Sequence, residues 1–335
     1  MLSFFHACAI LSSFVVKKYV KNNYKIYRNP KQNGGHAVSF TIIVFVKQVP
    51  DTQNITGEAM KADGTVNRAA LPAIFNPEDL NALELALQLK DRYGAKVVVG
   101  TMGPPNAAEV LRDALYRGAD EAVLLTDRNF AGADTLATSY ALSCCAKKIG
   151  KFDLILCGRQ AIDGDTAQVG PQLAEKLKIP QISYIEEVIS LDKHKVKARR
   201  AIEGGYEILE TPVPAMLTVI DSNDPRPPAA KKIMKFKKAI TRSELVKAHA
   251  GANYTDAEAL AEEEENLKTK NLWINEWNAS SVDADPQRIG LAGSPTKVKK
   301  IESVVLTAAD FKKIEANEQG INGLIHELIQ DHTLG

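Results

Sequence analysis

Hydrophobic and polar residues alternate along this chain in blocks that are typical of repeated strand–helix units. Continuous apolar, often β-branched runs predict strands that are buried on both faces, at 40–46, 95–101, 121–126 and 152–157. Apolar residues three and four apart predict helices between these runs, at 77–93, 105–117 and 133–149. Repeated units of this kind imply an α/β fold, with a mostly parallel open sheet and flanking helices.

The pattern changes after Pro180. Polar and apolar residues alternate over 181–191, 195–202 and 206–209, with Gly204 and Gly205 between the last two runs, and 212–220 returns to a buried strand. This pattern predicts an antiparallel hairpin added to the parallel sheet. The proline- and lysine-rich stretch 221–238 predicts an exposed loop. An acidic stretch with Trp273 and Trp277 follows, and the sequence leaves the role of this stretch open. The chain then ends in a C-terminal arm.

Local signals place the helix starts. Asn76 followed by Pro77 predicts a capped start for the 77–93 helix, and Gly94 predicts its end. Asp165 and Gln168 have capping-box spacing, so a helix is expected from about Thr166, with a kink at Pro171. Gly158 and Gly164 permit a tight turn before it. The start of such a helix suits a diphosphate, and ligands of parallel sheets bind at the carboxyl ends of the strands.

The residues at this turn carry a resemblance. The run from Gly158 to Asp163 reads GRQAID, and further matches in order lie at 46–51, 76–77, 101–105, 198–218, 223–226 and 292–296. Together they resemble the beta subunit of electron transfer flavoproteins. The resemblance implies a Rossmann-like, adenine-nucleotide-binding version of the α/β fold, in which the GRQAID loop wraps the nucleotide phosphates.

The resemblance also implies which nucleotide is bound. Beta subunits of simple family members hold AMP, with a DDDCNQTG-type loop, and those of electron-bifurcating members hold FAD and accept hydride from NADH. The GDTAQVGP run at 164–171 and the AGSPT run at 292–296 resemble the bifurcating branch. We therefore expect FAD as cofactor and NAD as substrate, with AMP as the alternative.

The family positions that match this sequence give a set of expected cofactor-binding residues. They are Phe45, Val46, Lys47, Asn76, Asp79, Thr101, Met102, Gly103, Asp134, Thr135, Thr138, Gly158, Arg159, Gln160, Ala161, Ile162, Asp163, Gly164, Asp165, Thr166, Ala167, Gln168 and Val169. No catalytic acid, base or nucleophile is expected among them. Arg159 has two open interpretations, a partner of phosphate or reduced flavin and a surface ion pair. Thr135 and Thr138 either contact the flavin or cap a helix.

The implied partners are those of a bifurcating pair. They are an alpha subunit, an acyl-CoA dehydrogenase or related flavin dehydrogenase, and ferredoxin or flavodoxin as low-potential acceptor. In the family, the loop equivalent to 221–238 docks on the dehydrogenase through a leucine, and Ala230 occupies that position here. The alternative for that stretch is a solvated basic loop. The rival for the whole chain is a non-bifurcating subunit that holds structural AMP.

Composition changes this picture little. A net charge of +1 gives no reason to expect nucleic-acid binding. Cys8, Cys144, Cys145 and Cys157 show no metal or iron–sulfur spacing, so no metal is expected, and a reducing cytoplasm is the expected location. Cys144 and Cys145 adjoin in a helical pattern, which predicts one core and one surface thiol.

The chain divides into three expected parts. Residues 1–37 have an apolar run that precedes its lysines, the reverse of a signal peptide, and we expect a leader or non-native extension with the native start near Val38. A membrane-anchored tail is the alternative. Residues 38–240 form the nucleotide-binding domain, and 241–335 the acidic insertion and the arm that contacts the alpha subunit.

Overall fold

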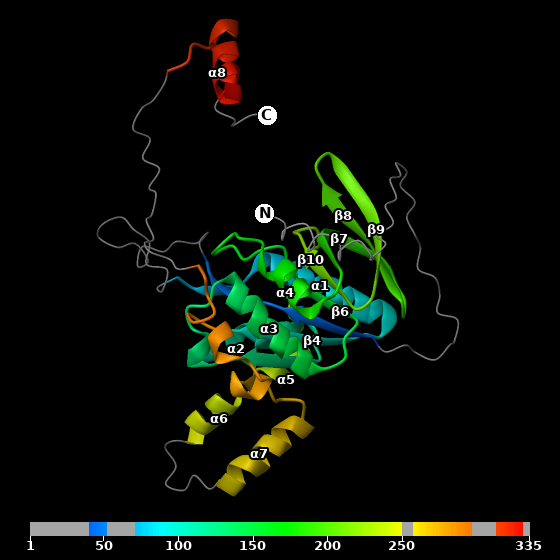
Figure 1. Ribbon diagram of the computed structural model, residues 1–335, viewed down its shortest axis with the longest axis vertical. Helices are drawn as coiled ribbons and strands as arrows, with labels where there is room; N and C mark the ends of the chain where they lie inside the picture. Colours follow the sequence, from blue (N-terminus) through cyan, green and yellow to red (C-terminus); the bar gives the residue numbers. More distant parts are fainter. Residues whose placement is uncertain (1–39, 52–70, 250–256, 297–312, 331–335) are drawn as a thin grey trace, which may run out of the picture.

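The computed structural model describes residues 40–51, 71–249, 257–296 and 313–330. The expected leader, residues 1–37, lies outside the described residues. The centre of the molecule is a nine-stranded sheet with the order β11-β5-β4-β1-β6-β10-β7-β8-β9 (Figure 1). Its strands are β1 (Thr41–Phe45), β4 (Lys96–Met102), β5 (Glu121–Leu125), β6 (Leu154–Gly158), β7 (Gln181–Leu191), β8 (Lys195–Ile202), β9 (Gly205–Pro212), β10 (Ala215–Val219) and β11 (Asn275–Trp277).

The sheet is parallel from β11 to β7, and β8 and β9 add the antiparallel hairpin. The predicted α/β fold, a mostly parallel open sheet with an antiparallel addition, is therefore confirmed. A separate two-stranded ribbon pairs β2 (Gln48–Pro50) with β3 (Ala73–Phe75) in antiparallel fashion. This ribbon brings the chain from the end of β1 back toward the start of the first helix.

Helices cover both faces of the sheet (Figure 1). On one face lie α1 (Pro77–Tyr93) and α2 (Ala108–Arg117), and on the other lie α3 (Thr135–Ile149) and α4 (Val169–Leu177). The remaining helices are α5 (Ala230–Phe236), α6 (Arg242–His249), α7 (Ala257–Thr269) and α8 (Glu318–Gln330). None of the helices in the described ranges is long and apolar enough to cross a membrane. Gly94 ends α1 in a left-handed conformation with φ 70°, as its position in the sequence predicts.

Two hydrophobic clusters divide the core between the faces. One packs α1 and α2 against the sheet, and the other packs α3, α4 and the segment around Val282 and Ile289. Strand β1 lies between them, which explains its unbroken apolar run: Ile42, Ile43 and Val44 are fully buried. Cys144 and Cys145 are both buried, so the expected surface thiol is wrong. Helix α3 packs against the sheet, against α4 and against the segment around Val282, so more than one of its sides is buried.

Two elements beyond residue 220 differ from expectation. The predicted exposed loop 221–238 contains α5, which packs against α2 and buries Phe236. Further on, β11 pairs in parallel with β5 at the sheet edge, with Trp277 opposite Leu125. The sheet therefore extends past residue 240, where the sequence placed the end of the α/β domain. A three-residue strand is too short to show a strand periodicity.

Candidate functional site

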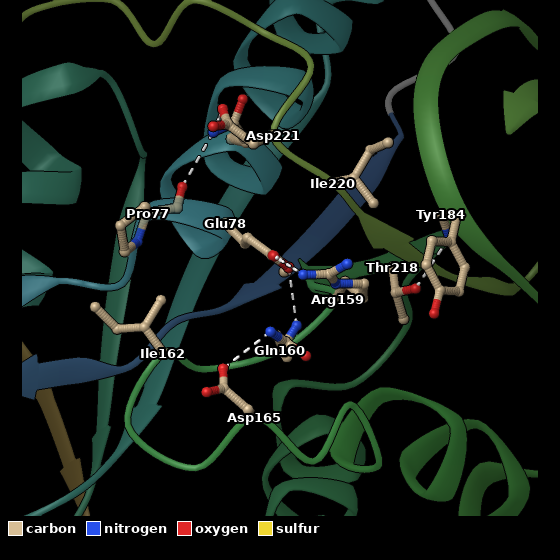
Figure 2. Close-up of polar contacts among 12 residues, drawn as sticks. Pro77, Glu78, Arg159, Gln160, Ile162, Asp165, Tyr184, Thr218, Ile220 and Asp221 are labelled. Atoms are coloured by element: carbon tan, nitrogen blue, oxygen red, sulfur yellow. Dashed lines mark hydrogen bonds and ion pairs between the residues drawn. The ribbon is translucent and has the colours of Figure 1, made fainter. Parts of the chain in front are cut away.

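The candidate site lies at the carboxyl edge of the sheet, where the loop from β6 to α4 passes the start of α1 (Figure 2). Asn76 is fully buried just before α1. Its Nδ2 donates to the Gln160 carbonyl oxygen at 2.9 Å, and its Oδ1 accepts from the Ile162 amide at 3.1 Å. It makes no side-chain hydrogen bond that caps α1, so the predicted capping role is wrong. The side chain shapes the loop instead.

Glu78, in the first turn of α1, holds the same loop. One carboxylate oxygen accepts from the Gln160 amide at 3.0 Å, and the other accepts from the Arg159 guanidinium at 2.6 Å (Figure 2). Glu78 is a site residue that the sequence did not predict. The position of Glu78 in the first turn of a helix with a buried start could have indicated this role, because a buried carboxylate needs hydrogen-bond donors.

Asp79 joins two strands. Its carboxylate accepts from the Gly158 amide at 2.8 Å and from the Lys47 amide at 2.9 Å, at the ends of β6 and β1. Burial raises the pKa of Asp79 to about 7, against the lowering effect of these hydrogen bonds and of Asn76 and Lys47. Gly158 has no room for a side chain, because a Cβ there would lie 2.7 Å from the Asp79 amide nitrogen. Asn76 and Asp79 therefore position the loop through contacts within the chain.

The outer part of the loop is held by weaker, more exposed contacts. The Lys47 ammonium pairs with the Asp163 carboxylate at 2.7 Å, with half of the lysine side chain exposed. The Gln160 side chain donates to Asp165 at 2.9 Å (Figure 2). Asp165 and Ala167 adopt left-handed φ values of 49° and 52°. These conformations are uncommon for residues other than glycine and concentrate at binding loops.

Helix α4 begins at Val169 rather than near Thr166, and the predicted capping box is absent. The Asp165 side chain is bound by Gln160, and Gln168 makes no capping hydrogen bond. Pro171 consequently lies in the first turn of α4, where backbone N–H groups have no partner within the helix. A proline there removes no helical hydrogen bond, so the predicted kink is not needed. The start of α4 keeps uncapped N–H groups and has no acidic residue in its first turn.

The start of α3 contacts this loop from the other side. Thr135 donates to the Gln168 side chain at 2.9 Å. Asp134 caps α3 through the Ala137 amide at 3.0 Å, and it also accepts from the Thr296 amide at 3.0 Å. Burial would raise the pKa of Asp134, but these backbone hydrogen bonds outweigh burial and lower it. The AGSPT segment is thus tied to the start of α3, and Thr138 lies half-buried one turn further along.

Other expected residues point into the core. Phe45, Val46 and Thr101 have buried side chains, and Phe45 packs on Gly100, where a Cβ would lie 2.9 Å from its ring. Met102 and Gly103 are half-buried, and residues 164–166 and Gln168 are exposed. The structure therefore brings the 158–169 loop together with Lys47, Asn76, Asp79, Asp134 and Thr135.

Arg159 forms an ion pair, but with Glu78, whose side chain is only 11% exposed, so it is not the surface ion pair that was one of its two open interpretations. Its guanidinium pairs with Glu78 and lies 5.8 Å from the centre of the Tyr184 ring, and its buried Nε has no hydrogen-bond partner (Figure 2). Tyr184 has φ 61° at an irregularity where β7 pairs with β10. Sequence reasoning missed Tyr184, because a bulge within a strand leaves no clear pattern.

The family follows from comparison with known proteins. The model of the electron transfer flavoprotein domain matches residues 63–246. The electron transfer flavoprotein subunit beta of Clostridium acetobutylicum is 47% identical over 260 residues, covering 77% of this chain and 86% of the relative. The chain belongs to the electron transfer flavoprotein beta-subunit family.

Other members of this family carry more specific names. The caffeyl-CoA reductase-Etf complex subunit CarD of Acetobacterium woodii is 43% identical over 260 residues, with 77% of this chain and 85% of the relative covered. The acryloyl-CoA reductase electron transfer subunit gamma of Anaerotignum propionicum is 38% identical over 303 residues, with 88% and 99% covered. Each of these two electron transfer flavoprotein relatives is thus named for a CoA-ester reductase.

Proposed function

We propose that this chain is the beta subunit of a bifurcating, heterodimeric electron transfer flavoprotein that binds FAD at the 158–169 loop. In this proposal the pair takes hydride from NADH. It divides the electrons between ferredoxin or flavodoxin and, through the alpha subunit, an acyl-CoA dehydrogenase-type partner. The observation that carries the proposal is the preformed loop with left-handed Asp165 and Ala167 at the uncapped start of α4.

The residues present fit a dinucleotide. The first turn of α4 offers backbone N–H groups without a competing acidic side chain, which suits a pyrophosphate. Asp163 and Asp165 lie in the same loop, but Lys47 and Gln160 hold their carboxylates. Lys47 is exposed enough to exchange Asp163 for a phosphate oxygen. Flavin, when bound, supplies hydride acceptance and single-electron transfer, and the protein contributes binding and orientation.

The names of CarD and of the acryloyl-CoA reductase subunit support the acyl-CoA branch of the proposal, because both relatives serve reductases of CoA esters. For the docking site we propose α5, within the 221–238 stretch. Met234 on this helix is 61% exposed, and it offers an apolar side chain that Ala230 does not.

The C-terminal arm is proposed to contact the alpha subunit through α8. Ile321, Ile325 and Ile329 recur every fourth residue along this helix and are 52%, 43% and 51% exposed. An apolar stripe of this spacing is typical of a helix that packs on another surface.

Anaerobic titration of the co-purified alpha–beta pair with NADH tests the proposal. We expect NADH to bleach the flavin absorbance directly, without a dehydrogenase present. A pair whose flavin stays oxidised under excess NADH, yet is reduced by dithionite, would contradict NADH-dependent bifurcation. That result would favour the subunit that holds structural AMP.

A further inference from the structure

One cavity has no lining residue in the 158–169 loop. It is a depression of about 400 Å³ lined by α3, α4 and the segment 287–295. On α3 it is lined by Leu136 in the first turn and Tyr140 in the second, and on α4 by Lys176 near the end. No acidic residue lines this depression, which we call the Tyr140 pocket.

Arg288 is held in this pocket by an aromatic ring. Its guanidinium carbon lies 3.9 Å from the centre of the Tyr140 ring. The ring is itself fixed, because the Tyr140 hydroxyl accepts from the Asp285 amide at 3.1 Å. A guanidinium stacked on a ring keeps its N–H donors at the edge, arranged as a planar fork. Among the residues that the structure describes, none accepts a hydrogen bond from this guanidinium.

Lys176 brings a second cation to the same ring, with its ammonium 5.9 Å from the ring centre. Burial, together with the charge of Arg288, lowers the pKa of Lys176. The nearby carboxylates already have other partners. Glu175 pairs with Lys178, and Asp134 accepts from the amides of Ala137 and Thr296. Within the described ranges Lys176 makes no ion pair, so the pocket holds two positive charges, and no described carboxylate is paired with either.

We propose that the Tyr140 pocket binds a phosphate group of a small molecule, at a site separate from the nucleotide loop. A planar guanidinium fork beside an ammonium matches the oxygens and the double charge of a phosphate. A volume of about 400 Å³ is within the usual range for small-molecule sites, which is about 300–1,000 Å³. The polar side chains of Gln287 and Ser294 complete the lining.

The experiment uses ³¹P NMR line broadening of inorganic phosphate by the full-length chain, with acetate as the competing carboxylate at constant ionic strength. We expect saturable broadening that Arg288→Gln and Lys176→Gln each weaken at least tenfold. Lys151→Gln removes one charge from an exposed position outside the pocket and should leave the affinity unchanged. Circular dichroism spectra that match the unsubstituted chain show that each variant is folded.

The nucleotide loop is the competing phosphate site, and Lys47→Gln separates the two. Weaker phosphate binding in Lys47→Gln with none lost in Arg288→Gln would overturn the proposal, and so would the absence of saturable broadening. Equal competition by acetate would show a carboxylate site and also overturn it. None of these results depends on whether the chain binds FAD, so the failure of this inference is distinct from failure of the proposed function.

Discussion

Replacement of Asn76 by alanine tests whether the start of α1 shapes the nucleotide loop. The side chain is fully buried and makes two hydrogen bonds to the loop, 2.9 Å to the Gln160 oxygen and 3.1 Å from the Ile162 amide. A hydrogen bond contributes about 1 kcal/mol, and a buried group left without a partner costs about 1–3 kcal/mol. Gln160 and Ile162 are half-buried, so water compensates in part. We expect a loss of about 2–4 kcal/mol in the free energy of unfolding.

Urea unfolding, followed by circular dichroism, measures this change. Asn223→Ala is the matched control, because the Asn223 side chain is half-buried and makes only long hydrogen bonds, 3.3 Å to Ser222 and 3.4 Å from Gln88. The control should change the free energy of unfolding by no more than about 0.5 kcal/mol.

The second readout is the nucleotide that co-purifies with each variant. Because Asn76 holds the loop that we propose binds FAD, Asn76→Ala should lose most of the nucleotide, whereas Asn223→Ala should retain it. The reasoning is refuted if the two variants unfold within about 0.5 kcal/mol of each other and retain nucleotide equally.

Three further substitutions probe the same site. The folded pKa of Asp79 is raised from 3.8 to about 7, so its contribution to stability is present below pH 4 and is lost as the pH rises to 7. Asp79→Asn should therefore gain stability relative to the unsubstituted chain across that window, by up to about 4 kcal/mol in urea unfolding; a difference that is constant with pH would contradict the shift. Gly158→Ala should lower the stability of the folded chain by about 1–3 kcal/mol in thermal unfolding, because the added Cβ would meet α1. Gly164→Ala is the control and should change stability little, because no atom lies within 4 Å of its Cβ position. Equal effects of the two substitutions would argue against the close approach of Gly158 to α1. Lys47→Gln should lower the unfolding free energy by less than about 1 kcal/mol, since the Lys47 ion pair with Asp163 is half-exposed, yet reduce FAD retention; unchanged retention would remove Lys47 from the site.

Much of the fold follows from local patterns in the sequence. The strands of the parallel sheet are buried on both faces, so their apolar runs are unbroken, as in β1 and β6. Gly94 and Gly118 end α1 and α2 with positive φ, where glycine is favoured. The convergence of the β1 and β6 ends at one edge also follows, because the carboxyl ends of parallel strands lie together.

The details of the loop depend on contacts that are distant in sequence. The spacing of Asp165 and Gln168 suits a capping box, but Gln160 binds the Asp165 carboxylate and α4 begins later. Asn76 has the usual identity of a helix cap, yet its side chain turns to residues 160 and 162. In both cases a tertiary hydrogen bond replaces the local one, and sequence spacing does not reveal that exchange. The strand β11 escaped prediction for a different reason, since its pairing with β5 joins residues about 150 apart.

The nucleotide content of the co-expressed alpha–beta pair tests the central claim most directly. Heat release of bound nucleotides, followed by chromatography, counts FAD and AMP per heterodimer. The account predicts two FAD and no AMP, with one FAD assigned to the 158–169 loop by its loss in Asn76→Ala. One FAD with one AMP would contradict it, and would identify this chain as a subunit that holds AMP and docks partners.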